Sequence, residues 1–224
     1  MDKETIKVIK LFQSIIAGEE SIKGDGKVDT VGNNTPTFSW LRAKNAPNWR
    51  QMPKNGVGYT DTDTPDANIK DSRVEMNWGT DWLISTIKQA GIHFENNYRK
   101  GNNKVSLIYT NDLSLKKGGD TLDHLGHETG LLLDIRLPHF GGKAGGITWK
   151  KTSIYDRNAA RAMIQAFRAQ PLFKRCFFND TVLIAEGLCE PLEGHDNHIH
   201  ISIKPPALEF DLKTVPSNET ILAD

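Results

Sequence analysis

Two short windows of the sequence combine histidines with carboxylates in a way that suits binding of a metal ion. The first window runs from His124 to Asp134, and the second runs from Gly194 to His200. Five of the seven histidines in the chain fall within them. Imidazole nitrogens and carboxylate oxygens are usual ligands of zinc, and a catalytic zinc site has about three protein ligands plus water. The two windows therefore predict a metalloenzyme.

The second window predicts a strand with two histidines on one face. His198 and His200 are two residues apart, and residues two apart on a strand project from the same face. Both imidazoles would then point into one site, while Ile199 would pack in the core on the other side. The spacing leaves open whether both histidines bind metal or whether one binds while the other transfers protons.

The first window predicts a turn that brings two ligand types together. Gly130 lies between His127 and Asp134, and glycine adopts backbone angles that are closed to other residues. A turn at Gly130 would place His127 beside a following strand that carries Asp134. A carboxylate among leucines needs a partner. For Asp134 that partner is either a metal ion or, alternatively, an arginine or backbone amides.

Hydrophobic periodicity and capping residues predict the elements around these windows. We expect Thr80 to cap a helix that runs to Ala90 and stops at Gly91, and Asp156 to cap a helix that runs to about Ala169. A further amphipathic helix is expected over residues 4–17, and strands over residues 104–109, 131–137, 181–185 and 198–203. Helices and strands mix without a regular β–α–β rhythm, so the predicted fold class is α+β.

Composition narrows the class of protein. The chain has 224 residues with 28 basic and 28 acidic side chains, so its net charge is zero. No basic tract points to nucleic acid or an anionic membrane as partner, and no apolar run approaches the ~20 residues of a membrane-spanning helix. The N-terminus lacks the apolar stretch of a secretory signal, so we expect either a trimmed chain or export by a route without a cleaved signal.

The two cysteines and the N-terminal third leave alternatives open. Cys176 and Cys189 could close a small disulfide loop, as in an oxidising compartment, or remain two buried thiols. Residues 1–60 are expected to form an N-terminal helical extension, and residues 61–224 the catalytic domain. The stretch from Asp25 to Pro53 is interpreted first as a simple packing arm. Its short resemblance to the end of a peptidoglycan-binding module is the alternative.

The combined motif resembles a known family of enzymes. His127-x-x-Gly130-x-x-x-Asp134 followed by His198-x-His200 is similar to the LAS-type zinc peptidases, and most similar to their penicillin-insensitive murein endopeptidase branch. That branch has a further histidine three residues before each half of the motif, as His124 and His195 are here. The resemblance covers roughly residues 75–205. It departs from the family at Leu125, Gly126 and Leu132, where the family often has serine or another small residue.

The resemblance implies a fold and a role for each residue. The fold would be a central antiparallel sheet of the LAS type, flanked by helices and loops. His127, Asp134 and His200 would bind Zn²⁺, and His198 would be the general base or transition-state stabiliser, assisted by His195. His124 would line the site. Glu128 would be an exposed carboxylate rather than a catalytic group.

The same resemblance implies hydrolysis of peptide cross-links in the bacterial cell wall. The enzyme would act in the periplasm or outside the cell, and the lack of a signal favours an antibacterial effector or phage lysin, with an immunity or secretion partner in the first case. A D,D-carboxypeptidase or an L-Ala-D-Glu peptidase is the alternative within enzymes. A non-catalytic wall-binding protein is the second alternative, and the presence of His195 and His198, which the metal does not require, argues against it.

Overall fold

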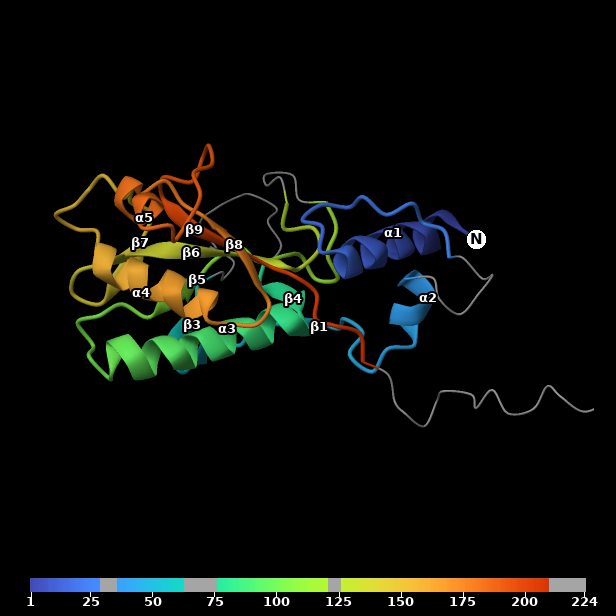
Figure 1. Ribbon diagram of the computed structural model, residues 1–224, viewed down its shortest axis with the longest axis horizontal. Coiled ribbons are helices and arrows are strands. Elements are labelled where there is room, and N and C mark those ends of the chain that lie inside the picture. The colour runs from blue at the N-terminus through green and yellow to red at the C-terminus, as the bar shows by residue number, and fades with distance from the viewer. Residues whose placement is uncertain (29–35, 63–75, 121–125, 210–224) are drawn as a thin grey trace, which may run out of the picture.

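A computed structural model of the chain describes residues 1–28, 36–62, 76–120 and 126–209. The elements of these residues mix helices with a multi-stranded sheet, which confirms the α+β class (Figure 1). The helices are α1 (Lys3–Ala17), α2 (Pro36–Leu41), α3 (Asp81–Phe94), the π-helical turn η1 (Glu95–Arg99), α4 (Arg157–Arg168) and α5 (Thr181–Ala185). The strands are β1 (Trp49–Gln51), β2 (Asn55–Gly56), β3 (Tyr59–Asp61), β4 (Trp78–Thr80), β5 (Ile108–Thr110), β6 (Leu132–His139), β7 (Lys143–Gly145), β8 (Phe173–Phe177) and β9 (His198–Ile203).

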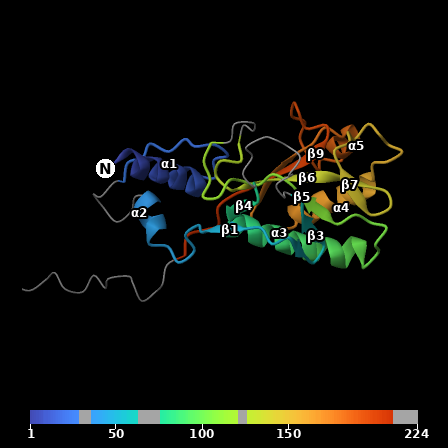
Figure 2. The same cartoon turned by 180° about the vertical axis from the view of Figure 1, so that it is seen from behind.

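The main sheet has the strand order β2-β3-β5-β6-β9-β8, and β7 pairs with β6 outside this path. Its centre is antiparallel, because β5 pairs with β6, β6 with β9 and β9 with β8 in that sense. The pair β3–β5 is parallel. Helices α3 and α4 lie side by side along the sheet, while α1 and α2 lie beyond one end of it (Figures 1 and 2). None of the helices in the described ranges is long and apolar enough to cross a membrane.

Side-chain alternation on β6 and β9 separates the core from the site. Leu133, Ile135, Ile199 and Ile201 are fully buried in one hydrophobic cluster with residues of α3 and α4. The residues between them on each strand point to the opposite face of the sheet. That second face carries Asp134 and His200, so the alternation seen in the sequence positions the polar groups together.

Two helices begin where their capping residues predict. The Thr80 hydroxyl accepts a hydrogen bond from the Leu83 amide at 3.2 Å, and the Asp156 carboxylate accepts one from the Ala159 amide at 3.0 Å. Each bond satisfies an amide that has no partner within the helix. Helix α4 then ends at Arg168, close to the expected end, which confirms that prediction.

The expected stop of α3 at Gly91 is wrong. The helix continues through Gly91 to Phe94 and runs into η1. A Cβ atom on Gly91 would meet the carbonyl oxygen of Val57 at 2.4 Å. Glycine is therefore needed here for close approach of the β2–β3 turn to the helix, and not for ending it. His93 lies in the last turn of α3.

The strand expected over residues 181–185 is also wrong, because Thr181–Ala185 forms α5. The Asp180 carboxylate accepts a hydrogen bond from the Val182 amide at 3.0 Å and so caps a helix. A short apolar run does not by itself distinguish a strand from a buried helical turn. The strand expected over residues 104–109 begins later, at Ile108.

The N-terminal 60 residues contribute strands to the main sheet and to a separate two-stranded sheet formed by β1 and β4. Strand β1 pairs with β4, and β3 pairs with β5. The ring of Trp40 lies 5.3 Å from that of Trp82 on α3, measured between centroids. The division into an extension and a catalytic domain at residue 60 therefore stays a prediction. Strand pairing and aromatic packing connect residues before and after this position. Cys176 and Cys189 are free and buried, which is the thiol alternative.

The turn at Gly130 gives a test of how tightly the site loop is packed. Gly130 has φ +65°, and a Cβ there would meet the Trp49 ring at 2.5 Å. We expect Gly130→Ala to lower the free energy of unfolding by about 2–5 kcal/mol, because backbone strain adds to overpacking. Gly101→Ala is the matched control, since Gly101 has φ +75° but no atom near the added methyl group. It should cost only about 1–2 kcal/mol in urea denaturation, and equal losses would show that Trp49 yields without cost.

Candidate metal centre

The register of β6 and β9 brings the second histidine window beside Asp134. Asp134 pairs directly with His200, and Arg136 pairs with His198. Paired residues in an antiparallel sheet share a face and have closely spaced Cβ atoms. All four side chains therefore lie on the face of the sheet opposite the main core. The expected strand with both histidines on one side is confirmed.

His127 reaches the same place from the loop before β6. Its backbone has φ +62°, a conformation uncommon for a residue other than glycine. The ring atom Nδ1 donates to the carbonyl oxygen of Leu113 at 2.6 Å. The other ring nitrogen, Nε2, lies 3.5 Å from Oδ1 of Asp134. Backbone strain of this kind is typical of positions held for function.

His127, Asp134 and His200 form a buried cluster that could hold a metal ion. Their ligand atoms all lie within 4.8 Å of one another, and each residue is at most 6% exposed. His200 Nδ1 lies 2.8 Å from Asp134 Oδ1. Ligands of one tetrahedral zinc with bonds of ~2.0–2.1 Å are roughly 3.4 Å apart. The separation of 3.5 Å between His127 Nε2 and Asp134 Oδ1 matches that spacing, whereas the 2.8 Å contact of His200 is a direct hydrogen-bond distance that a bound ion would lengthen. The three residues predicted as ligands thus meet in space.

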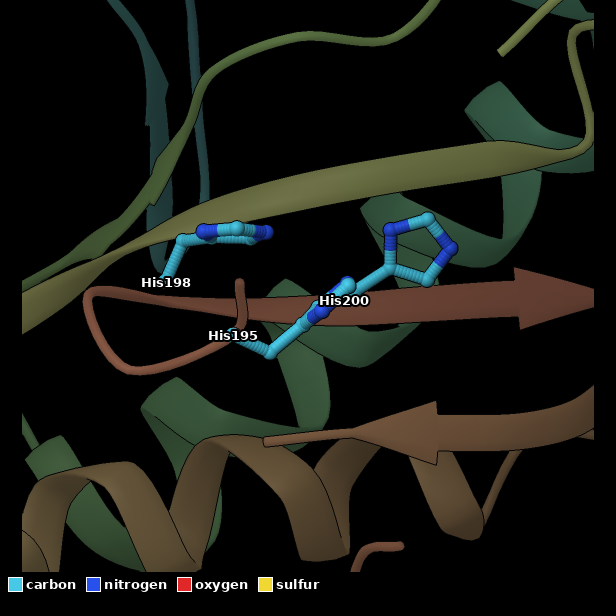
Figure 3. A group of neighbouring side chains, drawn as sticks. All are labelled: His195, His198 and His200. Atoms are coloured by element: carbon cyan, nitrogen blue, oxygen red, sulfur yellow. The ribbon is translucent and has the colours of Figure 1, made fainter. Parts of the chain in front are cut away.

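A second group, which shares His200, contains the other two histidines. His195, His198 and His200 also lie close enough for their ring nitrogens to hold an ion, and Figure 3 shows the three side chains gathered along β9 and the turn before it. The ring centroids of His195 and His198 are 4.7 Å apart. His198 Nε2 is 3.7 Å from Asp134 Oδ2. This group has no carboxylate and is more exposed than the first, so the first group is the better metal site.

Burial and charge shift the pKa of His127 in one direction and those of His195 and His198 in the other. Burial alone would raise the pKa of Asp134, but its contacts with His127 and His200 hold that pKa well below its ordinary value. Burial would lower the pKa of His127, yet the charge of Asp134 and hydrogen bonds to Asp134 and Leu113 outweigh it and raise that pKa. These contacts therefore favour an anionic Asp134 beside a protonated His127.

His195 and His198 behave in the opposite way. Burial is the main cause that lowers the pKa of each, and the neighbouring His200 adds to it. The carboxylate of Asp134 opposes this shift without reversing it. Both imidazoles are therefore neutral near neutral pH and can accept a proton. His198 is oriented by a contact of 2.8 Å between its Nδ1 and the side-chain oxygen of Asn197.

The N-terminal extension borders the site through two contacts. The Glu20 carboxylate accepts a hydrogen bond from Arg175 Nε at 3.0 Å, and Arg175 lies over the ring of Phe177. The Phe177 ring is 6.0 Å from that of His200. Glu128 accepts a hydrogen bond from the Ile22 amide at 2.6 Å. Glu128 is therefore a half-buried anchor of the extension, and the expectation of an exposed carboxylate is wrong.

Three residues near the cluster were not predicted from the sequence, and one predicted residue has no described position. His124 lies outside the described residues. Arg136, Asn111 and Phe177 line the site but were not predicted to do so. Arg136 could have been found, because it is two residues after Asp134 on the same strand and must share its face. Asn111 and Phe177 carry no comparable signal, since only the sheet pairing places them here.

Comparison with known proteins adds no family to this geometry. A scan against models of known protein families found no match, and a search of curated proteins found none either.

Metal analysis of variants tests the ligand set. We expect the wild-type protein to bind one zinc ion per chain, and His127→Ala, Asp134→Ala or His200→Ala each to weaken binding by more than the roughly 10- to 100-fold typical of residues beyond the ligands. His198→Ala should bind zinc within about tenfold of wild type. The measurement is competition with a chromophoric chelator. Loss of zinc from His198→Ala but not from His127→Ala would instead favour the three-histidine group.

Zinc binding should also depend on pH. Metal binding requires a neutral imidazole, and the raised pKa of His127 keeps this ligand protonated to a higher pH than an ordinary histidine. Affinity should therefore fall as pH drops from about 8 to about 6, around the ordinary histidine pKa, with release of a proton on binding. Calorimetry in buffers with different heats of ionisation measures that release. Binding without proton release over this range would contradict the assignment.

Proposed function

We propose that this protein is a zinc-dependent peptidase that acts on peptides of the bacterial cell wall. The observation that carries the proposal is the meeting of a buried His-Asp-His cluster, His127, Asp134 and His200, with His198, whose Nε2 lies 3.7 Å from the same carboxylate. A metal site alone needs only the first three residues. The adjacent neutral imidazoles supply the proton transfers that hydrolysis requires.

The cluster would hold the ion through His127 Nε2, Asp134 Oδ1 and His200 Nδ1. Zinc held by these three residues would supply a Lewis acid for the scissile carbonyl and for a water molecule. The hydrogen bond from His127 Nδ1 to Leu113 keeps the ring in the tautomer that a ligand needs. All three side chains are buried.

His198 would act as the general base. Its Nε2 points toward Asp134, and Asn197 holds its Nδ1, so the ring is fixed with one nitrogen facing the centre. It would take a proton from the attacking water and support the developing oxyanion. His195, whose ring is 4.7 Å away, would stabilise the protonated His198 or return the proton to the leaving amine.

The choice of wall peptides as substrate rests on the resemblance of the motif to the murein endopeptidases. Cleavage of cross-links is the first choice, and removal of a terminal D-alanine or cleavage of an L-Ala-D-Glu bond uses the same zinc and histidine chemistry. Activity as an antibacterial effector or lysin would follow from the same reaction. A non-catalytic wall-binding protein would keep the metal without a need for His195 and His198.

Digestion of purified peptidoglycan tests the proposal. Zinc-loaded protein should release new muropeptides, identified by mass spectrometry, and a chelator should abolish their release. His198→Ala should lower the rate by roughly 10²- to 10⁴-fold, the usual contribution of a general base, while zinc stays bound. His93→Ala is the matched control, since His93 lies on α3 outside both histidine groups. Unchanged muropeptides with zinc-loaded protein would rule out hydrolysis, and binding to the wall without cleavage would favour the non-catalytic alternative.

A further inference from the structure

Arg136 lies on the same face of the sheet as the His127–Asp134–His200 cluster. It is two residues beyond Asp134 on β6 and pairs directly with His198 on β9. Its Cα therefore lies only about 7 Å along the strand from that of the central carboxylate. Arg136 is half-buried, so its side chain is partly withdrawn from water. A cation thus adjoins the proposed general base on the side away from β8.

The guanidinium is anchored by neutral groups. Its Nε donates to the side-chain oxygen of Asn111 at 2.9 Å and to the hydroxyl of Thr62 at 3.1 Å. Asn111 is itself held, because its backbone amide donates to the Asp134 carbonyl and its side-chain amide donates to Asp112. The orientation of Arg136 is therefore set before any ligand arrives.

The terminal nitrogens of Arg136 make no hydrogen bond or ion pair with the residues that the structure describes. Other half-buried arginines differ in this respect. Arg99 pairs with Glu95, Arg157 with Asp180 and Arg175 with Glu20. The nearby carboxylate of Asp134 is already engaged by His127 and His200. Arg136 therefore has planar terminal donors without a direct partner among the described residues, and such donors match a carboxylate in bidentate geometry.

We propose that Arg136 binds a free carboxylate of the substrate, located on the carbon that carries the leaving amine. The inference rests on the proposed function, because the site of cleavage is the His127–Asp134–His200 cluster. One extended residue spans ~3.3–3.6 Å. A carboxylate one position beyond the scissile carbonyl therefore lies within reach of a side chain that starts two strand positions from Asp134.

This assignment defines a substrate class by its chemistry. An amide bond in the middle of an ordinary chain has another amide at that position. A terminal D-Ala-D-Ala bond has a free carboxylate there, and so does a wall cross-link made to the amine of a carboxylated D-centre. Arg136 thus selects amide bonds next to a free carboxylate, in a terminus or in a cross-link.

Binding to zinc-free protein tests the subsite without any need for catalysis. The probes are an N-acetylated peptide that ends in D-Ala-D-Ala, a cross-linked wall peptide, and the amide counterpart of each at the carboxylate in question. Calorimetry should show wild type preferring at least one free carboxylate over its amide by about 10- to 100-fold. Arg136→Ala should reduce that ratio to near one. Arg136→Lys should keep only part of it, because an ammonium cannot bind bidentately.

Arg161→Ala serves as the control for loss of a positive charge, since Arg161 pairs with Glu186 on the surface of α4. It should leave the ratio unchanged. Thermal melting should confirm that each variant is folded, and Arg136→Lys keeps the test valid if Arg136→Ala unfolds. Equal binding of carboxylate and amide by wild type, binding of neither, or an unchanged ratio in both Arg136 variants would overturn the proposal.

Cleavage of the same peptides by zinc-loaded protein tests the peptidase activity separately from the carboxylate subsite. Zinc-loaded wild type should cleave the preferred free-carboxylate peptide, and the cleaved member of the pair distinguishes a terminus from a cross-link. Carboxylate preference in the zinc-free protein without cleavage by the zinc-loaded protein would leave the subsite standing and refute the peptidase. Cleavage of the free-carboxylate peptide and of its amide at equal rates would support the peptidase and refute the carboxylate subsite at Arg136.

Discussion

The pairing of β6 with β9 is the constraint on which the rest of the site depends. It sets Asp134 opposite His200 and Arg136 opposite His198. Because side chains alternate along a strand, a slip of one residue would send the polar set into the core and the leucines and isoleucines to the site. The burial of Leu133 and Ile199 on the other face therefore fixes the register. The same apolar contacts that stabilise the sheet also bring the site together.

A single buried carboxylate then organises the charges. Asp134 has nitrogens of three histidines within 3.7 Å. Burial of an anion is costly unless it is paired and hydrogen-bonded, and this cost explains why the imidazoles converge on it. His127 and His200 are the best placed to share a metal ion with it. His198 and His195 lie farther out, where burial keeps them neutral. One carboxylate thus adjoins both the residues that could hold a metal ion and the two other histidines.

Two arginines on the strands around this cluster, Arg175 and Arg136, differ in their partners. Arg175 on β8 is neutralised by Glu20 from the N-terminal extension, which also reaches Glu128 beside His127. Arg136 on β6 is held only through its Nε, by neutral oxygens. The extension therefore removes positive charge on one side of the metal cluster, and positive charge remains on the other.

The sequence by itself determined the elements with strong local signals and three residues that meet in space, His127, Asp134 and His200. Capping at Thr80 and the alternation around His198 are local properties of a few residues, so they could be read directly. The helical turn at Thr181–Ala185 and the continuation of α3 past Gly91 could not, because a short apolar run and a lone glycine fit more than one structure. Only tertiary structure decided which groups surround the ligands. Phe177 and Asn111 reach the site through strand pairing between distant segments, and the charge left on Arg136 depends on which carboxylates the fold places elsewhere.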